Sequence, residues 1–386
     1  MNTKQKVIIG GVAVLVVVVG WFFFFRQTPK RELIQVTNPT SSIDNGPANT
    51  GNVSPISGLA CDNWNKRAVA VMQPADVSAR PAAGFSDADI VFEMPVFTNS
   101  NTRLMGVYLC NVPTDSGSMR SARHDYLPLA AGLDAVFVHW GYSKFAQTLL
   151  EQKIIDNIDC LTTSFCPRWP QTGIMKYEDT GHITSDSVFA AMKKYNYRTE
   201  GQFLGYPHQN ELPSGDRPQG GTLRIAYPNP YDVTYAYDRD TNSYLRTWDK
   251  TADTDKNNGK RIAPKNIAVL TVEDEQIKLA TDWAARGVKN PWDLVPKDEQ
   301  AGLDYGGVGR YNNLNMGDPW FDTKDTGTAA YYLNGKEYRG TWKKDKSKLD
   351  SKLTFLNDDG TEVKFVPGQI WVEVVEPGMG VKWEGQ

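Results

Sequence analysis

A glutamate and an arginine on neighbouring strand-like segments are the first residues that could carry chemistry. Residues 88–94 read ADIVFEM, and the alternation of side chains along a strand puts Asp89, Val91 and Glu93 on one face. The next segment, 102–110, is expected to form an antiparallel hairpin in a register that pairs Glu93 with Arg103. This pair is either a structural ion pair or a catalytic acid or base, Glu93, whose pKa Arg103 adjusts.

A second group of cationic side chains lies in the segment DSGSMRSARHD, residues 115–125. One helical turn would gather Arg120, Arg123 and His124 beside the backbone N–H groups near Gly117 and Ser118. Guanidinium groups next to backbone donors can bind a carboxylate or a phosphate. We therefore predict an anion or substrate site formed by Arg103, Arg120, Arg123 and His124. The alternative is that the arginines pair with Asp115, Asp125 or Glu93 and only fix a loop.

His139 ends the apolar run DAVFVHW, just before Gly141 and Ser143, where a helix is expected to begin. A histidine at the end of a strand can act as a general acid or base, and the alternative is a hydrogen-bonded structural residue. The four histidines of the chain show no zinc-ligand spacing, and no nucleophile elbow, phosphate loop or dinucleotide fingerprint occurs. We expect neither a metal nor a cofactor.

The chain contains four cysteines, which allow three disulfide connectivities. We favour Cys61 with Cys110, which would connect the start of the first domain to the end of a strand. Cys160 with Cys166 would close a short loop. Disulfides of this kind are typical of proteins outside the cytoplasm.

The pattern of apolar residues predicts an α+β fold in two parts. Residues 61–210 mix strand-like runs with two helices and form a mixed α/β N-terminal domain. The helices lie at 143–153, capped by Ser143, and at 185–195, capped by Thr184 or Ser185 with Phe189 facing inward. Residues 211–386 contain successive strand-like runs, including 361–368, and form a β-rich C-terminal domain with a loop insertion near 274–325.

The N-terminal region predicts a membrane anchor. Val7–Phe25 are 19 uncharged, mostly apolar residues, enough for one transmembrane helix, and residues 1–6 form a cytoplasmic tail. Residues 26–60 are a flexible linker of mainly polar composition. The linker and the even number of cysteines place the C-terminal bulk outside the cell membrane. A net charge of −3 without a basic block argues against binding to nucleic acid.

Several motifs resemble those of the YerB-like family of bacterial envelope proteins. The matching residues are Arg80-Pro81 with Gly84, the run Ala88–Glu93, Thr102-Arg103, Arg120–Arg123 and His139, followed in the C-terminal part by matches at 266–272, 328–344 and 355–375. The resemblance covers nearly the whole region after the linker. It implies an N-terminal and a C-terminal domain of unknown function. Members are often lipoproteins, whereas this chain carries an apolar span.

These features predict a membrane-anchored extracytoplasmic protein of the bacterial envelope. Its expected role is to bind an anionic cell-wall glycan or peptidoglycan through the cationic residues. Cleavage by Glu93 and His139 is an extension of this hypothesis, and the sequence leaves open whether the protein is an enzyme. The alternative is a non-catalytic envelope scaffold whose β-rich domain binds a protein partner.

Overall fold

The computed structural model describes residues 52–385, apart from 97–98, 277–311, 315–324 and 346. The predicted cytoplasmic tail, the predicted span Val7–Phe25 and most of the linker therefore lie outside the described residues. Thr50–Gln386 form one compact unit. Among the helices within the described ranges, none is both long and apolar enough to span a bilayer.

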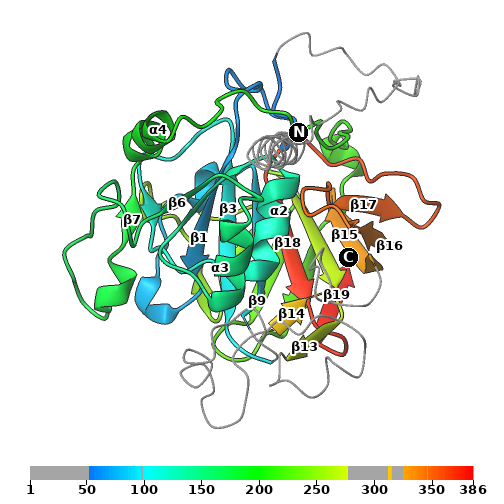
Figure 1. Cartoon of the computed structure of the whole chain (residues 1–386). Coiled ribbons are helices and arrows are strands. Elements are labelled where there is room, and N and C mark those ends of the chain that lie inside the picture. The colour runs from blue at the N-terminus through cyan, green and yellow to red at the C-terminus, as the bar shows by residue number, and fades with distance from the viewer. Residues whose placement is uncertain (1–51, 97–98, 277–311, 315–324, 346, 386) are drawn as a thin grey trace, which may run out of the picture. The chain divides into compact units, whose positions relative to one another are not determined.

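A ten-stranded mixed sheet forms the centre of this unit (Figure 1). Its strands, in order across the sheet, are β17 (Thr354–Asn357), β16 (Lys336–Lys343), β15 (Thr326–Leu333), β12 (Asn266–Thr271), β18 (Ile370–Val375), β2 (Ile90–Pro95), β3 (Thr102–Tyr108), β1 (Val69–Pro74), β5 (Val136–His139) and β6 (Asn157–Asp159). Their residues are rich in Val, Ile, Tyr and Phe, which favour a pleated, buried surface.

A second, antiparallel sheet of five strands packs against one face of the large sheet. Its strands are β11 (Thr251–Ala252), β10 (Ser243–Trp248), β9 (Val233–Asp238), β8 (Gly221–Ile225) and β19 (Val381–Gly385). Two small sheets consist of β13 (Asp274–Gln276) with β14 (Asn312–Leu314) and of β4 (Ser116–Gly117) with β7 (His182–Ile183).

Three α-helices of the described region are α2 (Leu127–Gly132), α3 (Lys144–Glu151) and α4 (Ser185–Lys194). Short 3₁₀ turns are η1 (Val77–Ala79), η2 (Phe85–Asp87), η3 (His124–Tyr126), η4 (Tyr177–Asp179) and η5 (Ser214–Asp216). Ser143 and Thr184 cap α3 and α4 as predicted, since Ser143 Oγ accepts from Ala146 N and Thr184 Oγ1 from Ser187 N, both at 3.2 Å.

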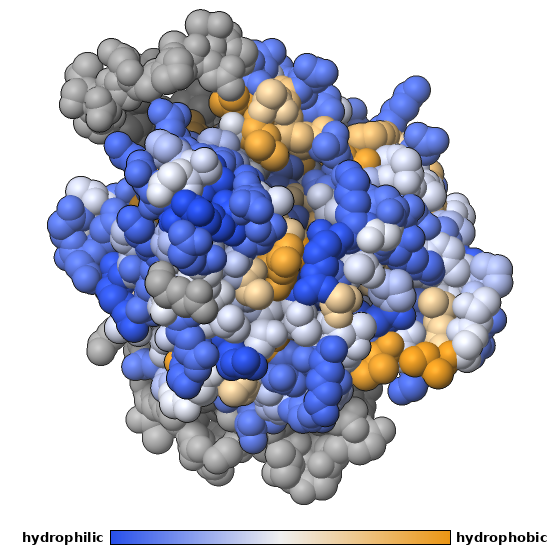
Figure 2. Space-filling view, turned by 180° about the vertical axis from the view of Figure 1, so that it is seen from behind, coloured by the Kyte–Doolittle hydropathy of each residue, from blue (hydrophilic) through white to orange (hydrophobic). Residues whose placement is uncertain are grey.

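The large sheet separates two apolar cores. Helices α2 and α3 cover one face of it in Figure 1, and their buried side chains, such as Leu129 and Leu149, pack with Phe92 and Val372. The five-stranded sheet covers the opposite face, where Tyr235 joins the second core. The resulting layers are helices, large sheet and small sheet. The surface seen from behind is mostly hydrophilic, with a few small hydrophobic patches (Figure 2).

The prediction of a mixed fold of helices and large sheets is confirmed. Strands from both predicted segments, 61–210 and 211–386, nevertheless enter one sheet, because β18 lies between β12 and β2 and is parallel to both. The two segments therefore share their cores. Of the predicted insertion at 274–325, the structure describes β13, β14 and Asp325.

Two local predictions are wrong. Residues 361–368 form no strand, because they run as irregular chain with isolated bridges such as Leu356 to Glu362. Phe189 on α4 is 52% exposed rather than buried, because the inward stripe of this helix consists of Val188, Ala191 and Met192.

Strand direction distinguishes one edge of the large sheet. Strands β12, β18, β2, β1, β5 and β6 all run the same way, so their carboxyl ends meet at a single edge. We call this the carboxyl edge. Open sheets of parallel strands usually bind their ligands at such an edge, because side chains of the following loops converge there.

Candidate anion-binding site at the carboxyl edge

The loop 118–123 brings two of the predicted arginines to the carboxyl edge. The N–H of Arg120 donates to the carbonyl of Met72 in β1 at 2.9 Å, and the carbonyl of Arg120 accepts from Trp140 N at 3.0 Å. The N–H of Ala122 donates to Gly141 O at 2.9 Å. The loop is therefore held between the ends of β1 and β5 by backbone hydrogen bonds, which fix where its side chains emerge.

Arg103, at the start of β3, meets this loop. Its Nη1 donates to the carbonyl oxygen of Ser121 at 2.5 Å, and Nη1 of Arg123 lies 3.4 Å from the same oxygen. Burial, together with the nearby charges of Arg123 and Arg120, lowers the pKa of Arg103 well below its usual value. The structure thus brings Arg103, Arg120 and Arg123 near one another, in an irregular loop and not in the helical turn that we expected.

Arg120 is the member of the group that is bound to carboxylates. Its Nη2 pairs closely with Asp179, which is fully buried, and lies 3.7 Å from Asp76 Oδ2. Its Nη1 donates to the carbonyl of Glu178 at 2.6 Å. The alternative prediction, that an arginine fixes a loop, thus applies to Arg120, although its partners are Asp76 and Asp179 and not those that we expected.

His124 does not open toward this site. It is buried, and its Nε2 lies 3.4 Å from Asp125 Oδ1, so the side chain points into the protein. The predicted role of His124 as a ligand to an external anion lacks access here. His182 is also fixed internally, with Nδ1 2.7 Å from Asp115 Oδ1 and its ring stacked on Trp169.

The structure adds a cation between aromatic rings that the sequence analysis missed. The guanidinium carbon of Arg168 lies 4.2 Å from the ring centre of Trp140 and 4.3 Å from that of Tyr177. Tyr177 is 63% exposed, and Tyr142, which follows Trp140, is 41% exposed. Arg168 lies in an irregular segment without periodicity, so only the fold reveals its position beside the site.

Glu93 lies away from the arginine group. In the hairpin of β2 and β3 it is opposite Leu104, and Arg103 is opposite Met94, so the predicted register is wrong by one residue. The Glu93 carboxylate is fully buried, accepts from Thr102 Oγ1 at 2.5 Å and pairs with Arg246 Nη2 at 2.5 Å. The strand faces are as predicted, but Glu93 faces the five-stranded sheet.

Glu93 belongs to a buried set of charges between the two large sheets, which we call the interlayer charge cluster. Its members are Arg80, Glu93, Arg246, Asp253 and Glu373. Arg246 on β10 pairs with both Glu93 and Asp253, and Asp253 also pairs with Arg80 at 2.9 Å. These contacts connect β2 of the large sheet with β10 of the small one.

Glu373 on β18 lies directly opposite Glu93 on the parallel strand β2. Both side chains are fully buried, and Tyr227 OH donates to Glu373 Oε2 at 2.9 Å, while Tyr235 OH donates to Oε1. Burial and the adjacent Glu93 raise the pKa of Glu373 to about 8. Glu373 is therefore mostly protonated at neutral pH.

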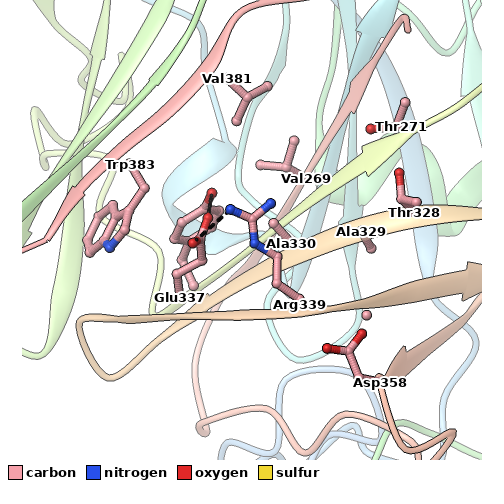
Figure 3. A pocket seen from close by; sticks show the side chains of 12 residues that line it. Val269, Thr271, Thr328, Ala329, Ala330, Glu337, Arg339, Asp358, Val381 and Trp383 are labelled. Atoms are coloured by element: carbon pink, nitrogen blue, oxygen red, sulfur yellow. Dashed lines mark hydrogen bonds and ion pairs between the residues drawn. The ribbon is translucent and has the colours of Figure 1, made fainter. Parts of the chain in front are cut away.

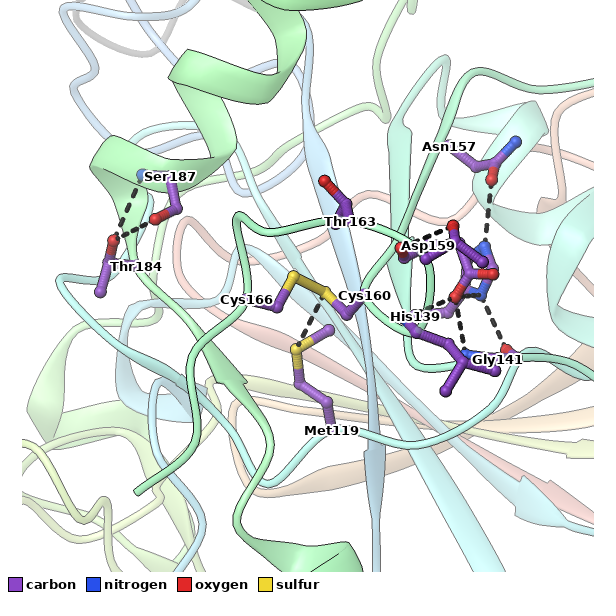
Figure 4. Close-up of a disulfide and its surroundings, with 12 residues drawn as sticks. Met119, His139, Gly141, Asn157, Asp159, Cys160, Thr163, Cys166, Thr184 and Ser187 are labelled. Atoms are coloured by element: carbon purple, nitrogen blue, oxygen red, sulfur yellow. Dashed lines mark hydrogen bonds and ion pairs between the residues drawn. A yellow bond between two sulfur atoms is a disulfide. The ribbon is translucent and has the colours of Figure 1, made fainter. Parts of the chain in front are cut away.

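His139 is also fully buried. Its Nδ1 lies 2.8 Å from the carbonyl oxygen of Gly141, and its Nε2 lies 3.2 Å from Asn157 Oδ1 (Figure 4). Burial lowers the pKa of His139, so the ring is neutral at pH 7. Glu93 and His139 are thus separate, enclosed residues, and neither reaches an external polymer in this structure.

Both favoured disulfide pairs are present. Cys61 is bonded to Cys110 with a Cα–Cα distance of 5.2 Å, and Cys160 to Cys166 with 5.3 Å (Figure 4). Within the described ranges, no group of three or more His, Cys, Asp or Glu side chains is arranged to hold a metal ion.

Several residues that carry the family resemblance have structural tasks. Arg80 pairs with Asp253, and Gly84 N donates to Asp255 Oδ1 and Oδ2 at 3.1 Å. Gly84 has φ of +104°, a conformation that favours glycine, and an added Cβ would lie 3.0 Å from Pro113. The Arg-Pro and Gly motif therefore connects the N-terminal part of the chain to the loop after β11.

Comparisons with known proteins agree with this architecture. Residues 56–196 match the N-terminal domain, and residues 223–300 and 307–372 the C-terminal domain, of the protein family of unknown function DUF3048. The chain is 24% identical over 330 residues to "Putative lipoprotein YerB" of Bacillus subtilis (strain 168), covering 83% of this chain and 86% of the relative.

A solved structure gives the same fold. The crystal structure of the YerB protein from Bacillus subtilis matches with a TM-score of 0.66 and 23% identity, over 86% of this chain and 99% of that chain. The resemblance inferred from the motifs is confirmed. The chain belongs to the DUF3048 family.

Proposed function

We propose that this protein binds anionic groups of a cell-wall polymer through the arginines at its carboxyl edge. The observation that carries the proposal is the meeting of Arg103 and Arg123 at the carbonyl oxygen of Ser121, with Arg120 in the same loop. Three guanidinium groups in one place repel one another, and an added carboxylate or phosphate would relieve that repulsion.

The neighbouring aromatic side chains support a polymer of sugars as the ligand. Tyr177 and Tyr142 are exposed beside the arginines, and the Arg168 guanidinium lies over the rings of both Tyr177 and Trp140. Exposed aromatic rings bind the apolar faces of sugar rings, while arginines bind their acidic substituents. Cleavage is left out of the proposal, because Glu93 and His139 are enclosed by internal partners.

The ligand class can be tested by cosedimentation of the full chain in detergent micelles with isolated sacculi. One sample keeps its phosphate-containing polymers, and the other is stripped of them so that only peptidoglycan carboxylates remain. Binding to both indicates carboxylate recognition, and binding to the first alone indicates phosphate recognition. Absence of binding to either sample would remove the proposal and favour the non-catalytic scaffold.

The proposal includes anchoring by Val7–Phe25 with the folded part outside the cell membrane. YerB is named a lipoprotein, but lipidation of this kind requires a free cysteine thiol, and all four cysteines of this chain are paired in disulfides. The 19 uncharged residues can serve as the anchor instead. Deletion of Val7–Phe25 should release the protein from washed membranes. Retention on membranes, or incorporation of a labelled fatty acid, would contradict this form of anchoring.

A further inference from the structure

The last strand, β19, forms one edge of the five-stranded sheet and pairs with β8. Its backbone register shows which groups face away from β8. Ala226 N donates to Gly380 O at 2.8 Å, so Gly380 and Ala226 are a hydrogen-bonded pair. Such pairs recur at every second residue of an antiparallel ladder, so Lys382 and Glu384 also bond to β8.

The remaining backbone groups of β19 point to the open edge. They are the N–H and C=O groups of Val381, Trp383 and Gly385, and within the part of the chain that the structure describes they have no hydrogen-bond partner. A row of unpaired backbone groups on an edge strand is a template for another extended chain.

A cavity of about 450 Å³ lies beside this edge, between β19 and strands β15 and β16. Its lining includes Val381 and Trp383 from β19 and Glu337 and Arg339 from β16 (Figure 3). The ring of Trp383 contacts that of Tyr332 on β15, with ring centres 5.2 Å apart, and the cavity lies beside this contact. A strand added to the edge would have room for the side chains that it directs toward the interior.

The side chains on the opposite face of β19 indicate which chain supplies the added strand. Lys382 is 70% exposed and Glu384 50% exposed, and they pair with each other at 2.6 Å. In an antiparallel pair of two β19 strands related by a twofold axis at Trp383, Lys382 is opposite the Glu384 of the second copy. On the other side of the axis, Glu384 is opposite the Lys382 of the second copy, so both facing pairs join opposite charges.

We propose that two copies of this chain associate edge to edge through β19. The outward groups of Val381, Trp383 and Gly385 then bond to Gly385, Trp383 and Val381 of the second copy, giving about six backbone hydrogen bonds. The two five-stranded sheets become one continuous sheet across the dimer. The backbone ladder and the charge pattern agree on this register, which distinguishes a second copy from an unrelated peptide.

A charge swap tests the proposal. The molar mass of the full chain in density-matched detergent micelles is measured by sedimentation equilibrium over a range of concentrations. We expect Lys382→Glu to lower the association constant about tenfold or more, because two glutamates then face each other twice. The double variant Lys382→Glu with Glu384→Lys should restore association to within about threefold of the original. Lys348→Glu, an exposed lysine away from β19, is the matched control.

A second variant tests the backbone ladder. Val381→Pro removes an N–H that points to the open edge and not to β8, so the monomer should fold normally, as judged by its circular dichroism and melting curve. Association should nevertheless fall to the level of Lys382→Glu. Carbodiimide cross-linking of a mixture of ¹⁴N and ¹⁵N chains should yield mixed-isotope peptides that join Lys382 to Glu384.

Three results would overturn the proposal. A chain that remains monomeric at all concentrations has no β19 dimer. A dimer that persists unchanged in both Lys382→Glu and Val381→Pro uses another surface. Failure of the double swap to restore association, with the folding of the variant intact, would refute the twofold register.

Discussion

The proton that Glu373 retains when it is buried beside Glu93 gives the most quantitative prediction for this fold. The pKa of Glu373 is about 8 in the folded protein, against an ordinary value of 4.5. The folded protein therefore keeps a proton that the unfolded chain releases above pH 4.5. Stability must fall as pH rises between these two values, because the unfolded state binds fewer protons.

The magnitude follows from the linkage between proton binding and folding. One proton of difference changes the free energy of unfolding by about 1.4 kcal/mol per pH unit. Between pH 5.5 and 7.5 the wild type should lose about 3 kcal/mol through this group. The glutamine of Glu373→Gln has nearly the shape of glutamate and can accept the hydrogen bond from the Tyr227 hydroxyl without carrying a charge. The pH-dependent loss of stability should therefore disappear in this variant.

The assay is urea denaturation of the oxidised full chain in micelles, followed by tryptophan fluorescence from pH 5.5 to 8.5. Glu373→Gln should have nearly the same stability as the wild type at the low end and exceed it increasingly toward the high end. The control is Glu384→Gln, which removes a carboxylate at the exposed edge strand and should leave the pH profile unchanged. A constant difference between Glu373→Gln and wild type at every pH would refute the retention of a proton by Glu373.

Three further predictions concern stability and use the same denaturation assay. Arg246→Met should cost about 3–5 kcal/mol, since it leaves the buried Glu93 carboxylate without its cation, and a cost below about 1 kcal/mol would contradict the cluster as described. Replacing both Cys61 and Cys110 by Ala should cost about 4 kcal/mol from their sequence separation of 49, and removal of the short-loop disulfide, with a separation of 6, about half as much. Gly84→Ala should destabilise by more than about 1 kcal/mol because of its positive φ, and an unchanged midpoint would show that this loop can relax.

The sequence predicts local elements well where periodicity and capping decide them. The strands at 90–95 and 102–108 and the caps at Ser143 and Thr184 follow from residue types and spacing. These features depend on neighbouring residues, for which a single sequence contains the necessary information.

The sequence did not predict which strands and side chains from distant parts of the chain pair with each other. Nothing in the run ADIVFEM indicates that β2 lies beside β18, from almost 300 residues later in the chain, or that Arg246 is the partner of Glu93. A shift of one residue in the hairpin register places Arg103 opposite Met94, and therefore on the other face of the sheet from Glu93. Register depends on the whole packed sheet, and a slip by one residue exchanges the faces.

The arginine site was also predicted from the sequence only in part. The spacing along the sequence grouped Arg120 with Arg123. Arg103 lies beside them in the structure, but it contacts their loop through the carbonyl oxygen of Ser121 and does not pair with Glu93. Arg168 and its aromatic neighbours were missed, because they reach the site from an irregular segment more than 40 residues further along the chain.

The central claim is that the arginines at the carboxyl edge bind an anionic polymer, and the most direct test is the affinity of the full chain for isolated sacculi. The double variant Arg103→Gln with Arg123→Gln is compared with Arg339→Gln, a 70% exposed arginine on β16, at low and high salt. We expect the double variant to bind at least about tenfold more weakly at 50 mM NaCl, Arg339→Gln to bind normally, and the difference to shrink at 500 mM. Equal affinity of the correctly folded double variant and the wild type at low salt would contradict the claim.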